Sequence, residues 1–212
     1  MKPERPKVPG SAGCTCAALA VLLLSLLANR VGAQTDDLDW IDWKSLDAGE
    51  VAVQTSKVDR GTVHIDLAIE IDADWQSVWG LLTACEISPE FVPNVLACRR
   101  LAAVDNCNCE LFEQTVKPAF FLPKFDHVFE LEYFPPQRIE VRHVSGPIDR
   151  MDGSWTLMQS ADRPLVLIHS MTVKPGFPVP PLFIRNTLKR DMPKVLMEIR
   201  DRSERASAAR AH

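Results

Sequence analysis

Most of the second half of the chain alternates apolar and polar residues with a period of two. Six segments show this pattern, and residues typical of turns separate them: Val95–Leu101, Glu110–Lys117, Phe125–Phe134, Arg138–Val144, Gly153–Gln159 and Leu165–Val173. Period two is typical of a half-buried strand, and short connections between consecutive strands favour antiparallel pairing. An earlier segment, Thr62–Ile71, has the same pattern, with Ile65, Leu67 and Ile69 on one face. The sequence therefore predicts an antiparallel sheet of about seven strands with one apolar face.

Two short helices are expected directly after the first strand. Asp72 or Asp74 can cap the first helix. The apolar residues of that helix are spaced by three and four: Trp75, Val78, Trp79 and Leu82. Pro89 then forces a second short turn, because proline does not continue an α-helix. We expect this broken pair to close one end of the sheet, with the tryptophans filling that end.

A long amphipathic helix is expected near the C-terminus, after the extended segment 174–181 that reads KPGFPVPP. Apolar residues share one stripe of it: Ile184, Leu188, Met192, Val195, Leu196 and Ile199. Pro193 lies inside this helix and is expected to kink it. An antiparallel sheet with one apolar face needs a cover, and this helix is the element long enough to supply it. We therefore predict an α+β fold in which a curved sheet wraps around the last helix.

The first 33 residues have the features of an export signal. Three basic side chains lie within residues 2–7, an apolar run extends from Ala17 to Ala28, and Val31-Gly32-Ala33 fits a cleavage site. The alternative is an uncleaved membrane anchor, but the run is shorter than the roughly 20 residues of a spanning helix. We therefore expect cleavage near Ala33 and a periplasmic or secreted protein.

Cleavage would leave 179 of the 212 residues, which is the length of one domain. It would remove four basic residues and one acidic residue, so the formal net charge would change from −4 to −7. This charge argues against nucleic acid as a partner. We expect a lead-in segment over residues 34–57 that packs Trp40, Trp43 or both against the domain, one globular domain over 58–207, and a disordered tail over 208–212.

Four cysteines follow the signal: Cys85, Cys98, Cys107 and Cys109. In an oxidising compartment one or two disulfides are expected, and the sequence does not separate the three possible full pairings. A bond between Cys107 and Cys109 is not the first choice, because a Cys-x-Cys pair on a strand is strained when joined. The spacing of the same two residues does not match the usual zinc motifs, so we expect neither a metal nor a cofactor.

Three stretches of the chain carry local motifs in a distinctive order: IEIDADWQSVWGLLTACEISPEFVPNVLACRRL from Ile69, GPIDRMDGSWTL from Gly146, and LKRDMPKVLMEIRDRSE from Leu188, with LDAGEVAV from Leu46 upstream. Their order and spacing resemble the START-like helix-grip superfamily (SRPBCC), in particular its polyketide cyclase/dehydrase and coenzyme Q-binding branch. The resemblance covers roughly Ser45 to Glu204. It implies a helix-grip fold with an apolar cavity between the sheet and the last helix, which holds lipids, quinones, sterols or polyketides.

The chain departs from this family pattern in two turns. Ala73-Asp74 stands where the family often has Ala-Pro, and Thr83-Ala84-Cys85 stands where it often has Thr-Asp-aromatic. A role that the second turn has in relatives is therefore not carried over to this chain.

If the apolar face of each strand turns inward, the cavity is lined by side chains from the strands and the last helix: Phe112, Gln114, Phe125, His127, Phe129, Tyr133, Trp155, His169, Met171, Ile184, Leu188 and Met192. Such a wall is mostly apolar with a few polar groups, as ligand pockets are. The alternative is that the same side chains only fill a core.

Three hypotheses for the function follow. The first is an exported, non-catalytic module that binds a hydrophobic small molecule such as a lipid, a quinone or a polyketide-like compound. The second is a cyclase or dehydratase in which His127 or His169 acts as general acid or base, although the sequence shows no nucleophile motif and no paired inward carboxylates. The third is a protein-interaction module whose cavity is filled by side chains.

The last helix also carries a basic face formed by Arg185, Lys189, Arg190 and Lys194. Such a face can approach the anionic head groups of a membrane, which would make the protein a peripheral membrane binder. The alternative is a solvated face without a partner.

Overall fold

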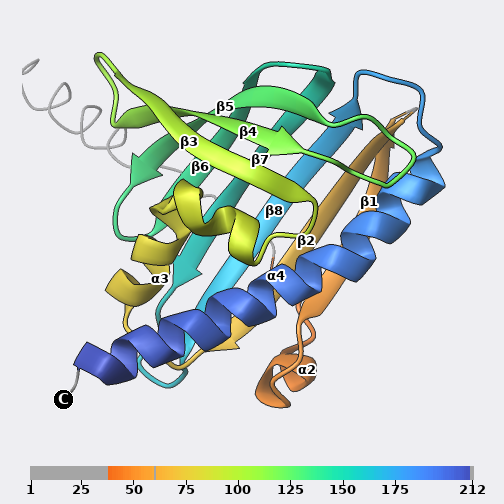
Figure 1. Cartoon of the computed structure of the whole chain (residues 1–212). Helices are drawn as coiled ribbons and strands as arrows, with labels where there is room; N and C mark the ends of the chain where they lie inside the picture. Colours follow the sequence, from red (N-terminus) through yellow and green to blue (C-terminus); the bar gives the residue numbers. More distant parts are fainter. Residues whose placement is uncertain (1–37, 60, 211–212) are drawn as a thin grey trace, which may run out of the picture. The chain divides into compact units, whose positions relative to one another are not determined.

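The computed structural model describes residues 38–59 and 61–210, and the expected export signal lies outside these residues. From Asp39 on, the chain forms one unit that is built from an eight-stranded sheet and a long C-terminal helix (Figure 1). The strands are β1 (Ala52–Asp59), β2 (Thr62–Ile71), β3 (Val95–Val104), β4 (Cys109–Val116), β5 (Phe125–Phe134), β6 (Arg138–Ser145), β7 (Ile148–Met158) and β8 (Leu165–Pro175). The helices are α2 (Trp43–Asp47), α3 (Trp75–Thr83), the 3-10 helix η1 (Cys85–Glu90) and α4 (Pro181–Arg210).

All neighbouring strands pair antiparallel, in the order β1-β2-β8-β7-β6-β5-β4-β3. Five of these pairings join consecutive strands from β3 to β8 through short turns, as the alternating segments predicted. The first predicted strand, β2, then pairs with the last one, β8, so that Ile65 lies opposite Met171 and Ile69 opposite Leu167. The predicted α+β helix-grip architecture is therefore confirmed, with eight strands in place of about seven.

The eighth strand is β1, which lies in the segment that was expected to be a lead-in. Residues 34–57 were assigned to that lead-in, but Ala52–Asp59 pairs with β2 along its length. The strand escaped the sequence analysis because it lies at the edge of the sheet, where most of its side chains are exposed and mostly polar. The short helix α2 precedes it, and the guanidinium of Arg163 lies 4.9 Å from the centre of the Trp43 ring. This contact supports the expected packing of Trp43 against the domain.

Helix α3 begins where the sequence predicted. Asp74 is its N-cap residue, and its carboxylate accepts a hydrogen bond of 2.8 Å from the backbone N–H of Ser77. The helix ends at Thr83, and η1 continues the chain through Pro89. A disulfide between Cys85 and Cys98, with Cα atoms 5.5 Å apart, fastens η1 to β3.

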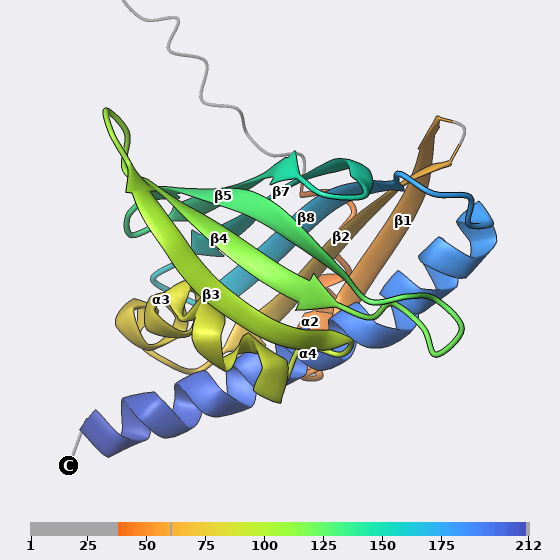
Figure 2. The same ribbon diagram turned by 45° about the horizontal axis from the view of Figure 1, so that its top comes forward.

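The long helix α4 packs mainly against β2 and α3, while the sheet curves over it (Figure 2). Val195, Leu196 and Ile199 form one hydrophobic cluster with the apolar residues of β2 and β8. The helix continues through Pro193 and extends to Arg210, which pairs with Asp74 at 2.8 Å. Residues 208–210, expected in a disordered tail, are therefore helical.

The remaining two cysteines also form a disulfide. Cys107 and Cys109, whose Cα atoms are 5.2 Å apart, are bonded to each other in the turn that leads into β4. This pairing was not the first choice from the sequence. The expectation assumed that both residues lie on a strand, whereas only Cys109 does.

Candidate ligand-binding site

The face of the sheet that turns toward α4 carries the strand residues predicted to line a cavity. Directly opposed residues of an antiparallel pair share one face. Gln114 lies opposite His127, Phe112 opposite Phe129, Trp155 opposite His169, and Leu67 opposite His169. Since Leu67 belongs to the cluster that α4 covers, the whole row faces the helix.

The middle of this concave face is less completely buried than the regions on either side of it. Its apolar side chains face the helix but are only half-buried, and so are the nearest helix residues: Val141, Met151, Trp155, Met171, Leu188 and Met192. In the register, Gly153 lies between Val141 and Met171 and contributes no side chain of its own. A Cβ atom at Gly153 would lie 2.5 Å from the backbone oxygen of Ser170, so no larger residue fits there without a shift of β8. Solvent therefore reaches apolar surface that a filled core would cover.

On either side of this middle region the face is tightly packed. Toward β2 and β8, the cluster that includes Leu167 and Leu196 is fully buried. Toward β4 and β5, Phe112 and Phe129 stack with ring centroids 5.7 Å apart. Ile184 of α4 is buried as well. Of the predicted lining residues, Phe112, Phe129 and Ile184 therefore belong to packed regions, while Trp155, Met171, Leu188 and Met192 border the open region.

His169 lies at the buried side of the open region. Its ring stacks on Trp155 with the centroids 3.7 Å apart, and Nδ1 donates a hydrogen bond of 3.1 Å to the backbone oxygen of Ser154. Burial lowers the pKa of His169 to about 4. The imidazole is therefore neutral at neutral pH and is satisfied by the sheet itself.

His127 lies at the opposite side, on β5. Its Nε2 lies 3.2 Å from Oε1 of Gln114, and its ring stacks on Phe129 with the centroids 5.6 Å apart. Burial, together with the nearby His143, lowers the pKa of His127 to about 4. Phe125 continues this row outward and contacts Phe177 of the segment before α4, with centroids 5.8 Å apart.

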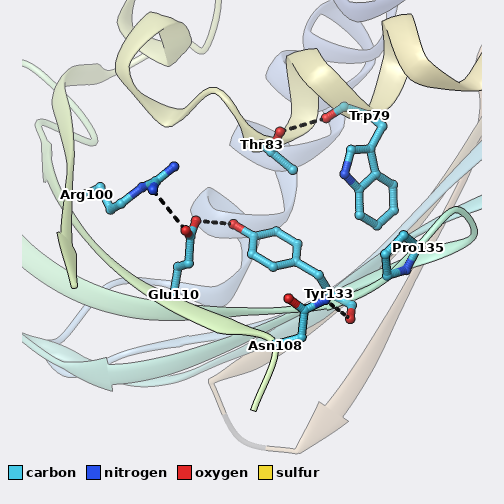
Figure 3. A pocket seen from close by; sticks show the side chains of 7 residues that line it. All are labelled: Trp79, Thr83, Arg100, Asn108, Glu110, Tyr133 and Pro135. Carbon is cyan, nitrogen blue, oxygen red and sulfur yellow. Dashed lines mark hydrogen bonds and ion pairs between the residues drawn. The ribbon is translucent and has the colours of Figure 1, made fainter. Parts of the chain in front are cut away.

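A small polar hollow of about 280 Å³ lies where α3 meets the sheet, and Figure 3 shows the side chains around it. Tyr133 donates a hydrogen bond of 2.9 Å to Glu110, and Arg100 lies 3.0 Å from the same carboxylate. Burial and the carboxylate of Glu110 raise the pKa of Tyr133 well above its usual range. Trp79 of α3 covers this group, with its ring centroid 6.2 Å from that of Tyr133. The tryptophan thus lies at the end of the sheet, as the sequence predicted.

The sequence analysis missed several residues of this face: Trp79 as a lining residue, Arg100, Glu110, Val141, His143 and Met151. The period of two could have identified two of them. Glu110 lies two positions from the predicted lining residue Phe112, and Met151 lies two positions from Gly153 on the same strand. His143, which is not among the predicted lining residues, lies opposite Phe129 and stacks on His127. The neighbouring Arg142 faces outward, where it pairs with Glu130 and Glu132.

Two findings concern metals and membranes. Within residues 38–59 and 61–210, no three His, Cys, Asp or Glu side chains are grouped so that they could hold a metal ion. In the same part of the chain, no helix combines the length and the apolar character required to cross a bilayer.

Comparison with known proteins bears on the fold. A family model described as "Polyketide cyclase / dehydrase and lipid transport" matches residues 71–200. No curated protein matches the chain.

Several solved structures are similar. A STAR-related lipid transfer protein from Xanthomonas axonopodis has 19% sequence identity and a TM-score of 0.56, with 70% of this chain and 97% of that chain covered. Human STARD10 has 16% identity and a TM-score of 0.61, with 82% of each chain covered. The Zhui aromatase/cyclase from Streptomyces sp. R1128 has 15% identity and a TM-score of 0.52, with 71% of this chain and 96% of that chain covered. At these identities the similarity establishes the fold.

Proposed function

Because the chain belongs to the polyketide cyclase / dehydrase and lipid transport family, we propose that it binds a hydrophobic small molecule between the concave face of the sheet and helix α4. The observation that carries this proposal is the apolar surface in the middle of that face, where Val141, Met151 and Met171 are only half-buried. A ligand that covers such surface gains about 25 cal/mol per Å². Affinity would therefore come mainly from apolar contact, and a lipid, a quinone or a polyketide-like molecule fits this chemistry.

Binding without catalysis is the better supported form of this function. One of the similar structures is named an aromatase/cyclase, and acid–base catalysis by His127 or His169 would be the corresponding role here. A general acid or base works best with a pKa near the working pH. Both histidines have a pKa of about 4, and His169 is already hydrogen-bonded to the backbone of Ser154. At neutral pH neither ring would supply a proton, and each would be a weak base.

A membrane is the proposed source of the ligand. The loop between β4 and β5 exposes Phe120 by 90% and Phe121 by 59%, and Leu182 at the start of α4 is 58% exposed. Phe121 contacts Phe183 with ring centroids 5.5 Å apart, so the loop and the helix start form one surface, which we call the aromatic tip (Phe120, Phe121, Leu182 and Phe183).

Basic residues lie on both sides of the loop and farther along α4. Lys117 and Lys124 flank the loop and are exposed. Lys189 and Lys194 on α4 are exposed as well and belong to the basic face predicted from the sequence, together with the half-buried Arg185. Arg190 of that face donates two hydrogen bonds of 2.8 Å to Asp191, and its guanidinium is therefore less available to bind anionic lipid head groups. Apolar side chains that insert among basic residues are typical of peripheral contact with an anionic lipid surface.

We further propose that the predicted signal exports the protein to the periplasm or out of the cell. The disulfide between Cys85 and Cys98 supports it, because such bonds persist in oxidising compartments. N-terminal sequencing of the exported protein tests it, since we expect the mature chain to begin at Gln34.

Solvent extraction of the purified protein, followed by mass spectrometry, tests the binding function. We expect a co-purifying apolar molecule in the wild-type extract. In the variant Met151→Trp, a larger ring would fill the half-buried face, and we expect at least a severalfold loss of that molecule. The matched control is Met197→Trp, because Met197 is 42% exposed on α4 and borders solvent. A wild-type extract that contains no apolar molecule, together with no binding of added fatty acid, would contradict the proposal.

A further inference from the structure

Two imidazoles lie side by side on the concave face, at the end near the loop between β4 and β5. The rings of His127 and His143 stack with centroids 6.3 Å apart. His127 is only 3% exposed, and its Nε2 lies 3.2 Å from Oε1 of Gln114. Because a carboxamide oxygen only accepts hydrogen bonds, Nε2 of His127 carries the proton. Its other nitrogen, Nδ1, is then an acceptor.

These two rings retain unused hydrogen-bonding atoms. Within the described part of the chain, Nδ1 of His127 and Nε2 of His143 are buried and have no hydrogen-bond partner. Buried polar atoms are nearly always paired in folded proteins, so an unpaired acceptor next to a second unpaired ring nitrogen points to a partner that the chain does not supply. Phe125 and Phe129 flank His127, with centroids 6.3 and 5.6 Å from its ring, and they offer no such partner.

The charged residues nearest to this pair along the strands face the other side of the sheet. Asp126 accepts a hydrogen bond from Thr115, and Arg142 pairs with Glu130 at 3.0 Å. Gly146 in the turn after β6 packs on the backbone side of His127, where a Cβ atom would lie 2.7 Å from Cβ of the histidine. The turn therefore fixes the position of His127. Phe125 and Phe129 flank its ring, and the nearby charge of Asp126 acts on it from the other face of the sheet.

We propose that His127, His143 and Gln114 bind a neutral hydroxyl group, a phenol or an alcohol, at the polar end of an otherwise apolar ligand. The hydroxyl hydrogen would be donated to Nδ1 of His127, and the hydroxyl oxygen would face Nε2 of His143. This inference rests on the proposed function and specifies the head group of its ligand. A ketone, an ether or a carboxylate only accepts hydrogen bonds and leaves Nδ1 unpaired. A carboxylate would in addition be buried without a compensating charge.

Three probes with the same apolar tail and different head groups test this inference: 4-nonylphenol, its methyl ether 4-nonylanisole, and 4-nonylbenzoate. Their binding to the purified protein can be followed by quenching of the fluorescence of Trp155 and the other tryptophans. We expect the phenol to bind about tenfold more tightly than the methyl ether, because only the phenol pairs the buried acceptor. The benzoate should bind more weakly than the phenol by at least the same factor.

The variant His127→Phe removes the acceptor and keeps a ring of similar size. It should bring the affinity for the phenol down to that for the methyl ether, while the affinity for the methyl ether stays within about twofold. The matched control is His64→Phe, because His64 lies on the outer face of β2, where it contacts Thr172 and Asp66. This control should retain the tenfold preference.

The binding measurements test the hydroxyl site separately from the proposed binding of an apolar molecule. Equal binding of phenol and methyl ether by the wild-type protein, or tighter binding of the benzoate, overturns the hydroxyl site and leaves the apolar binding function intact. A preference that survives His127→Phe also overturns the site. Absence of binding by all three probes overturns both. Since the comparison of probes uses the unaltered chain, the test does not depend on the folding of a variant.

Discussion

The ring of His169 stacks face to face on the indole of Trp155 across strands β7 and β8, with the centroids 3.7 Å apart. The pair marks the border between the packed core under α4 and the open middle of the concave face. Burial lowers the pKa of His169 and keeps the imidazole uncharged at neutral pH, and this has a measurable consequence for the stability of the fold.

We expect stability to fall as the pH is lowered from about 6.5 to about 4. Burial lowers the pKa of His127 and His169 to about 4, from an ordinary value of 6.5. In this interval the unfolded state binds more protons than the folded state. The stabilisation that each neutral histidine gives the folded state is therefore fully present above pH 6.5 and is lost toward pH 4. The free energy of unfolding falls by an amount on the order of 3 kcal/mol for each histidine. Urea unfolding across this pH range measures it, and a His127→Phe variant with an unchanged pH dependence would count against it.

The only tyrosine of the chain allows a direct test of the polar hollow. Burial and Glu110 raise the pKa of Tyr133, so its ionisation, followed by ultraviolet absorbance, should occur well above the ordinary value of 10.0. In Glu110→Gln the negative charge is removed while a hydrogen-bond acceptor remains, and the midpoint should move down. Glu113→Gln on the same strand is the control, because Glu113 pairs with Arg99 instead. A wild-type midpoint near the ordinary value of 10.0 would show that Tyr133 is not buried against the carboxylate of Glu110.

Asp74 joins the start of α3 to the end of α4, and its replacement should destabilise both contacts. Asp74→Ala removes the cap on Ser77 and the ion pair with Arg210. We expect a loss of about 1 to 2 kcal/mol in the free energy of unfolding, most of it from the cap. Asp72→Ala is the control, because the structure gives its exposed side chain no capping role, and it should change stability by less than about 0.5 kcal/mol. Chemical denaturation compares the two, and equal losses would reject the capping role.

The two disulfides should differ in their effect on stability. The bond between Cys85 and Cys98 closes a loop with a sequence separation of 13, whereas the bond between Cys107 and Cys109 spans only 2. Because stabilisation grows with the length of the closed loop, replacing the first pair by alanine should cost about 3 kcal/mol and replacing the second pair much less. Urea unfolding of the two double variants under non-reducing conditions measures this difference. The reverse order would contradict the prediction.

The aromatic tip should be required for contact with membranes. Replacing Phe120 and Phe121 together by serine removes the most exposed rings of this surface, and we expect at least a tenfold loss of binding to vesicles that contain phosphatidylserine. Phe134→Ser is the control, because Phe134 is 45% exposed at the other end of β5. Vesicle sedimentation provides the measurement. Binding that is insensitive to the double change, or equal for neutral and anionic vesicles, would reject this surface as the contact.

The sequence by itself determined the order of strands β2 to β8, the cap at Asp74 and the covering helix, because each depends on a short-range pattern. A period of two identifies which side chains of a strand share a face, and a period near 3.6 identifies the covered stripe of a helix. Phe112, Gln114 and His127 were placed together on this basis, and the pairing of β4 with β5 brings Gln114 directly opposite His127.

Only the tertiary structure decided which of these side chains meet and which stay uncovered. The pairing of β5 with β6 sets His143 opposite Phe129 and so brings its imidazole next to that of His127, and a local pattern does not contain the pairing between two strands. The strand β1 depends on an open edge of β2, and the disulfide pairing depends on where η1 lies against β3. The half-buried middle of the concave face follows from the curvature of the sheet and from where α4 crosses it, which are properties of the assembled fold.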